Sequence, residues 1–139
     1  MNSYGLIDLH CDTLAEYWKY AHTGNPDTLD DPGRVLSLSN MPKDVHWAQF
    51  YAVFIPDEER GQAAIDYFEK NRANFYRQME KFGNRVAPCR NADDMEKAWA
   101  AGKTAAFLTI ENGSALAGDL SRVHTLAEPV SYTHLTLPT

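Results

Sequence analysis

Apolar runs and amphipathic stretches alternate along this chain, and that alternation limits its possible folds more than any other feature. Four short runs are rich in the aliphatic, β-branched and aromatic residues of strands. They span residues 5–10, 47–55, 85–88 and 104–110. The last is apolar throughout, which is typical of a parallel strand buried on both faces.

The stretches that follow these runs are predicted to be helices. They span residues 12–20, 57–82, 91–100 and 119–127. In the long second stretch, Phe68, Phe75 and Met79 recur at helical spacing. Asn91 has a side chain suited to an N-cap. Residues 22–42 carry several proline turn signals and are predicted to form a long polar loop.

Strands that alternate with helices predict an α/β fold with a parallel sheet and helical crossovers. A complete (β/α)8 barrel takes roughly 250 residues, so four strands in this chain would form about half of one. The alternative is an open, doubly wound sheet. Against it, no glycine-rich phosphate loop follows the first strand.

Composition is that of a globular enzyme, with 44% hydrophobic and 23% charged residues. A net charge of -6 and the lack of a Lys/Arg-rich stripe argue against a nucleic-acid partner. The sequence shows no secretion signal and no apolar run of membrane-spanning length, so we expect a cytoplasmic protein. Cys11 and Cys89 belong to no metal or redox motif.

A candidate metal site follows the first strand. The apolar run 4–7 predicts a buried strand, and His10 and Asp12 stand at its carboxyl end. Residues two apart on a strand face the same side, so these two would present a nitrogen and an oxygen that zinc accepts. Cys11 between them should face away as a small buried filler. His-x-Asp alone is common, and a solvated strand end with Asp12 as a helix cap is the alternative.

The fourth strand also ends in an acid, Glu111. Because parallel strands end at one edge of a sheet, Glu111 could face the same opening as His10 and Asp12. A carboxylate can bridge two metal ions that lie about 3.5–4 Å apart. A lone solvated glutamate is the alternative, but two such signals at equivalent strand ends strengthen each other.

Three blocks of the chain resemble successive blocks of the membrane dipeptidases, also called renal dipeptidases or peptidase family M19. These blocks are residues 8–14, 48–55, and 110–116 with 119–121. The resemblance covers nearly all of residues 5–128. It implies a distorted (β/α)8 barrel of the metal-dependent hydrolase type that carries two zinc ions. His10 and Asp12 would bind one zinc ion, and Glu111 would bridge both.

The resemblance also implies hydrolysis of dipeptides, in which a metal-activated hydroxide attacks the peptide carbonyl. The implied partner is a small dipeptide, and a homodimer of the full-length parent is left open. The family's further metal and substrate ligands lie beyond these blocks, so no catalytic or substrate-binding residue is assigned. His124 is expected at the surface. Gln49 either orients groups at the opening or is a packed strand residue.

Two other classes of function compete with the dipeptidase hypothesis. One is another binuclear metal-dependent amidohydrolase, but such enzymes usually open with His-x-His where this chain has His10-x-Asp12. The other is a fragment without activity. Half a barrel would leave an open strand edge and uncovered apolar surface.

The last ten residues, 130–139, resemble an in-frame translation of a transposon-based sequencing adapter. We therefore predict a partial dipeptidase domain over residues 1–129 and an artefactual tail over 130–139. A natural strand is the alternative for this tail. On the adapter hypothesis the chain is the N-terminal part of a longer gene product and has little or no activity alone.

Overall fold

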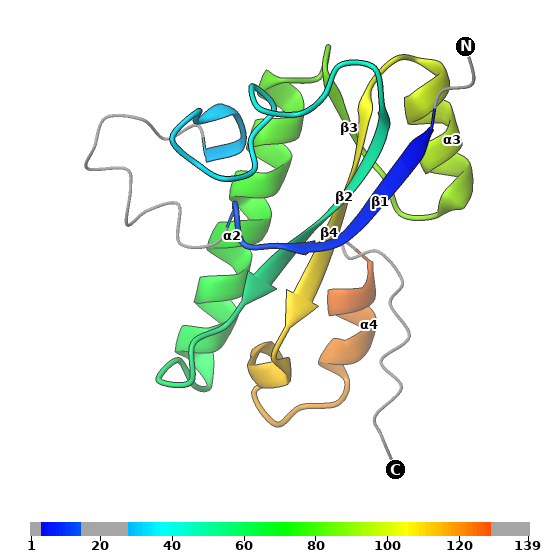
Figure 1. The fold of residues 1–139 in the computed structure, drawn as a ribbon. Coiled ribbons are helices and arrows are strands. Elements are labelled where there is room, and N and C mark those ends of the chain that lie inside the picture. The colour runs from blue at the N-terminus through cyan, green and yellow to red at the C-terminus, as the bar shows by residue number, and fades with distance from the viewer. Residues whose placement is uncertain (1–3, 15–27, 129–139) are drawn as a thin grey trace.

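The computed structural model describes residues 4–14 and 28–128 of the 139-residue chain. Its centre is a sheet of four parallel strands in the order β1-β2-β4-β3 (Figure 1). The strands are β1 (Gly5–Cys11), β2 (His46–Phe54), β3 (Val86–Pro88) and β4 (Thr104–Glu111). The predicted parallel α/β sheet is therefore confirmed.

The strand order departs from a simple succession along the chain. β4 pairs with β2, and the three-residue β3 lies beyond β4. The turn after the long helix brings the chain to the amino end of β4, where Thr104 N–H donates to the carbonyl of Arg85 at 2.9 Å. Pro88 has no N–H to donate, which suits an edge strand. The sheet therefore continues from β2 directly to the strand that carries Glu111.

Two helices cover opposite faces of this sheet. Helix α2 (Gln62–Lys81) packs Phe68 and Phe75 into one apolar cluster with Leu108 of β4. Helix α3 (Ala92–Ala100) packs against Phe107, the neighbouring residue of β4, in a second cluster. Since successive strand residues face opposite sides, the two helices lie on different faces.

Both helices begin at positions set by local backbone chemistry. Asn91 caps α3 as predicted, and its side chain accepts a hydrogen bond from Asp94 N–H at 2.9 Å. Helix α2 was expected from residue 57, but it begins at Gln62. Residues 56–60 form a turn instead, and Gly61 before the helix has a φ of 55°, in the left-handed region that favours glycine.

The segment predicted to be a polar loop contributes to the core. Within its described part lies a short 3-10 helix, η1 (Thr28–Asp30). Leu29, Leu38 and Met41 are buried in the same cluster as α2. The three apolar side chains are spaced among turn residues, so they show neither strand nor helix periodicity.

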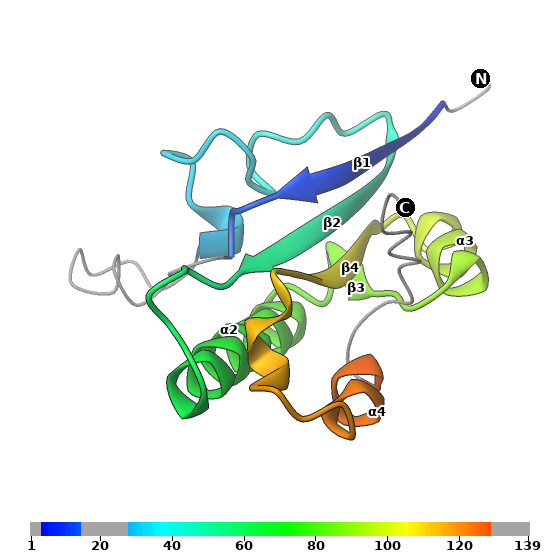
Figure 2. The same ribbon diagram turned by 90° about the horizontal axis from the view of Figure 1, so that it is seen from below.

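Strand β1 is not the buried strand that its apolar run predicts. It occupies the edge of the sheet (Figure 2), where Leu6 and Ile7 are exposed and Leu9 is 70% exposed. The open edge and uncovered apolar surface expected for part of a barrel are therefore present in the described residues.

The chain after β4 forms the 3-10 helix η2 (Gly113–Leu116) and the short helix α4 (Arg122–Ala127). The predicted helix over residues 12–20 lies outside the described residues except for 12–14. The tail over residues 130–139 lies wholly outside them. Within the described ranges, no helix has the length and apolar character needed to cross a lipid bilayer.

Candidate metal centre

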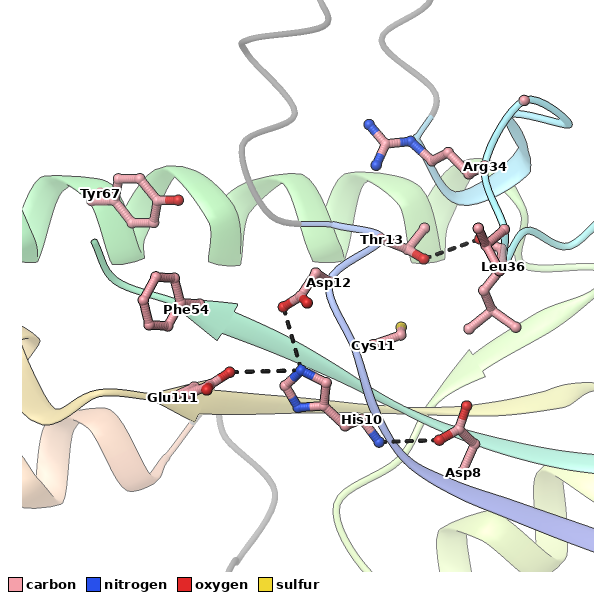
Figure 3. Close-up of a pocket in the computed structure, with 12 residues that line it drawn as sticks. Asp8, His10, Cys11, Asp12, Thr13, Arg34, Leu36, Phe54, Tyr67 and Glu111 are labelled. Atoms are coloured by element: carbon pink, nitrogen blue, oxygen red, sulfur yellow. Dashed lines mark hydrogen bonds and ion pairs between the residues drawn. The ribbon is translucent and has the colours of Figure 1, made fainter. Parts of the chain in front are cut away.

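A pocket of about 890 Å³ opens where β1, β2 and β4 end (Figure 3). His10, Asp12 and Glu111 line it, together with Arg34 and Tyr67. The carboxyl ends of parallel strands thus meet at one opening, where ligands bind in α/β folds.

Three of these side chains converge on one point. His10 Nε2 lies 3.5 Å from Asp12 Oδ1 and 3.6 Å from Glu111 Oε2. Within residues 4–14 and 28–128, this is the one group of three or more His, Cys, Asp or Glu side chains whose ligand atoms all lie within 4.8 Å of one another. The structure therefore brings together the three residues that the sequence analysis predicts to be metal ligands.

The spacing suits a zinc ion. Zinc bonds of 2.0–2.2 Å in tetrahedral geometry place two ligand atoms about 3.3–3.6 Å apart. The distances from His10 to the two carboxylates, 3.5 and 3.6 Å, match that separation. The side chains of His10, Asp12 and Glu111 are 52%, 64% and 49% exposed, so an ion can reach them from solvent.

An irregularity in β1 turns His10 toward Glu111. Asp8 pairs with Gln49 and Cys11 pairs with Tyr51, so β1 holds two residues where β2 holds one. This extra residue is a β-bulge, which interrupts the alternation of side chains. In an unbroken strand His10 would share the face of Asp8; here its imidazole meets Glu111 instead. Sequence periodicity alone could not show this.

The backbone around Glu111 is fixed by its neighbour. Asn112 has a φ of 76° and a ψ of 119°, a backbone with positive φ that is uncommon for residues other than glycine. Its side-chain amide donates to the carbonyl of Ile55 at 2.9 Å and accepts from Ser114 N–H at 3.0 Å. The first bond ties the end of β4 to the end of β2, and the second holds the start of η2 (Gly113–Leu116).

Cys11 faces away from the three ligands, as expected. It is partly buried and packs against the cluster that contains α2. Burial raises the pKa of the Cys11 thiol to about 11, because the apolar surroundings disfavour the thiolate. Cys11 is not part of the group of ligand atoms that converge on one point, so it is not assigned as a ligand.

Two other histidines lie apart from the pocket, and Gln49 supports the strand that carries His10. His124 is exposed on α4, as predicted. His46 lies at the opposite end of the sheet, where its ring is 5.6 Å from that of Trp99. Gln49 is fully buried and bonds to β1. No periodicity or motif marks Arg34 and Tyr67, which come to the pocket from a loop and from α2.

Comparison with solved structures finds a similar fold in two metallopeptidases and one amidohydrolase. Dipeptidase AC, a metallopeptidase of family M19, superposes with a TM-score of 0.75 at 18% identity, over 93% of this chain and 41% of that one. A metallopeptidase from Rhodobacter sphaeroides superposes with a TM-score of 0.72 at 17% sequence identity. The match covers 90% of this chain and 43% of that one. An amidohydrolase from Pseudomonas aeruginosa superposes with a TM-score of 0.51 at 20% sequence identity. That match covers 63% of this chain and 25% of the other.

These structures share a TIM-barrel-like fold with the chain, which spans 41% of the length of dipeptidase AC. The comparison with curated proteins found no match. The sequence itself matches the family model of the membrane dipeptidases, peptidase family M19, over residues 1–136. Because that match covers nearly the whole chain, the chain belongs to this family of metallodipeptidases.

Proposed function

We propose that this chain carries part of the zinc site of a dipeptidase, and that a polypeptide containing it with the remaining barrel strands hydrolyses dipeptides. One observation carries the proposal: the Nε2 atom of His10 lies within 3.6 Å of both the Asp12 and the Glu111 carboxylates. Membership of a metallopeptidase family supports the hydrolytic part.

Each residue has a distinct role in this proposal. Neutral His10 offers the lone pair of Nε2, and Asp12 offers one oxygen beside it. Glu111 directs one oxygen at His10 and has a second oxygen free for another cation, so it suits a bridging position. A divalent metal ion bound there would polarise a carbonyl and lower the pKa of water.

The pocket suits a small peptide substrate. Its volume of about 890 Å³ falls within the roughly 300–1,000 Å³ of small-molecule sites. The Rhodobacter sphaeroides metallopeptidase was solved with a phosphinate mimic of the dipeptide L-Ala-D-Ala. We propose dipeptides as substrates here too, with the Arg34 guanidinium and the Phe54 ring among the groups that face them.

The first test is metal binding by the chain itself. Zinc is titrated into purified protein and the dissociation constant is measured by calorimetry or by competition with a chromophoric chelator. We expect one ion per chain. His10→Ala should weaken binding about tenfold or more, because it removes the nitrogen donor. Glu111→Gln should also weaken binding, because an amide oxygen carries no charge.

His124→Ala is the matched control, since His124 is an exposed histidine on α4, away from the pocket. It should bind zinc as the parent chain does. If parent, His10→Ala and His124→Ala bind zinc equally, the assignment of the three ligands is wrong.

A further inference from the structure

Two side chains form hydrogen bonds with backbone groups in the β-bulge of β1. Asp8 Oδ1 accepts a hydrogen bond from the backbone N–H of His10 at 3.3 Å. On the other side, Gln49 Nε2 donates to the carbonyl of Asp8 at 3.4 Å. The first residue of the bulge and the histidine within it are therefore both held by side-chain groups.

Gln49 is itself fixed in place. It is fully buried in β2, directly across from Asp8. Its Oε1 atom accepts a hydrogen bond from Trp47 Nε1 at 2.9 Å, and its Nε2 also donates to the carbonyl of Phe50 at 3.3 Å. A buried amide whose donor and acceptor are both used has a defined orientation.

The bulge decides which way His10 points. Asp8 and Cys11 pair with Gln49 and Tyr51, which face the same side because they are two apart. The extra residue between Asp8 and Cys11 allows His10 to leave that side and approach Glu111. Bulges next to active sites commonly redirect a side chain in this way.

We propose that Asp8 and Gln49 are positioning residues that hold this bulge and thereby aim the His10 imidazole at Asp12 and Glu111. The inference rests on the metal site proposed above. Neither residue supplies a ligand; Asp8 acts through the His10 backbone, and Gln49 acts through the Asp8 carbonyl. Groups behind a metal ligand typically change metal affinity 10–100-fold when they are removed.

The test compares three variants of the 139-residue chain. Asp8→Ala removes the acceptor for His10 N–H, whereas Asp8→Asn keeps an acceptor oxygen and removes the charge. Asp44→Ala is the matched control, because Asp44 is an exposed aspartate at the other end of the sheet. Two readouts are taken: the zinc dissociation constant, and NMR contacts between the His10 ring and the Glu111 side chain without metal.

We expect Asp8→Ala to weaken zinc binding about tenfold or more and to lose the His10–Glu111 contact. Asp8→Asn and Asp44→Ala should keep both. If Asp8→Asn binds zinc as weakly as Asp8→Ala does, the charge of Asp8 rather than its hydrogen bond determines zinc affinity, and the proposal is overturned. An unchanged His10–Glu111 contact in Asp8→Ala overturns it as well.

Gln49→Met supplies a second test, since it keeps the length of the side chain and removes the amide. Its thermal midpoint is measured beside the NMR contact. The proposal requires loss of the His10–Glu111 contact in a variant that still unfolds cooperatively. If the parent chain binds no zinc, the proposed function fails, while the metal-free NMR comparison still decides the role of the bulge.

Discussion

Two thiols on opposite faces of the sheet are expected to give the chain a characteristic response to alkali. Burial raises the pKa of both Cys11 and Cys89 from 9.0 to about 11. In the unfolded chain both would ionise near pH 9, so between pH 9 and 11 the folded state holds more protons. The thiol contribution to stability is therefore complete below pH 9 and declines toward pH 11.

The prediction is measured by urea unfolding at pH 8, 9, 10 and 11. The free energy of unfolding should fall over this range, and the fall should be smaller in a chain carrying Cys11→Ala and Cys89→Ala. Tyr51, whose pKa is raised first by burial and then by the charge of Cys11, is present in both chains, so the part of its contribution that comes from burial is common to them. Equal slopes in the two chains would rule out the thiols as the source.

Asn112 is expected to contribute to stability through both its backbone and its side chain. Asn112→Ala places a less tolerant residue at a φ of 76° and removes the bond to the Ile55 carbonyl. We expect a loss of about 1–3 kcal/mol in the free energy of unfolding. Asn112→Gly relieves the backbone alone, so its loss should be smaller. Urea titration of both variants measures the difference, and equal losses would assign the whole effect to the side chain.

The three candidate ligands could be chosen from sequence because each stands at the end of a strand. What periodicity could not supply was the direction of His10, since a bulge depends on how two strands pair. Arg34 and Tyr67 were missed for a related reason: tertiary packing alone brings a loop and a helix to the pocket. The metal-binding role of the three ligands stays a prediction.

At the level of elements, helix α2 should supply much of the stability of the fold. Phe68 is 1% exposed and packs within the main cluster. We expect Phe68→Ala to lower the free energy of unfolding by about 3–5 kcal/mol, because it removes apolar contacts and leaves a cavity. Lys70→Ala, on the exposed side of the same helix, should change it by less than about 0.5 kcal/mol. Denaturant titration measures both, and a similar loss in the two variants would contradict this view of α2.

The helices and strands were predicted well where the hydrophobic periodicity is strong. They were predicted less well where strand pairing determines whether an element is buried. The parallel arrangement of the strands, and the bounds of β2 and β4 to within one residue, followed from composition and stop signals. The exposure of β1 could not follow, because an apolar run does not reveal which strand becomes the edge. The start of α2 was missed because charged residues 57–60 fit a helix as well as a turn.

At the level of the whole molecule, the chain alone is expected to lack dipeptidase activity. A catalytic zinc typically takes three protein ligands and a water molecule, so two ions need more donors than His10, Asp12 and Glu111 provide. The assay incubates purified chain and zinc with a panel of dipeptides and follows released amino acids. Turnover that His10→Ala abolishes would show that these donors suffice after all.

Residues 130–139 are expected to make no contribution to fold or binding. A chain ending at residue 129 should keep the unfolding midpoint and zinc affinity of the parent. The family match reaches residue 136 and so includes part of this segment, which makes the gene sequence the decisive measurement. Recovery of the same ten codons from unbroken genomic DNA would refute the adapter interpretation.

Strand β2 supplies none of the three ligands, yet it lies between β1, which carries His10, and β4, which carries Glu111. Neighbouring strands are about 4.8 Å apart, so the backbones of β1 and β4 are separated by roughly 10 Å. The imidazole at His10 and the carboxylate at Glu111 must span that gap from either side. The width of β2 therefore sets the distance that the two side chains must cover. An aspartate at position 111 would keep the negative charge, but its side chain would be one methylene too short to reach His10. At position 111 the spacing of the strands therefore constrains the length of the side chain as strictly as metal binding constrains its charge.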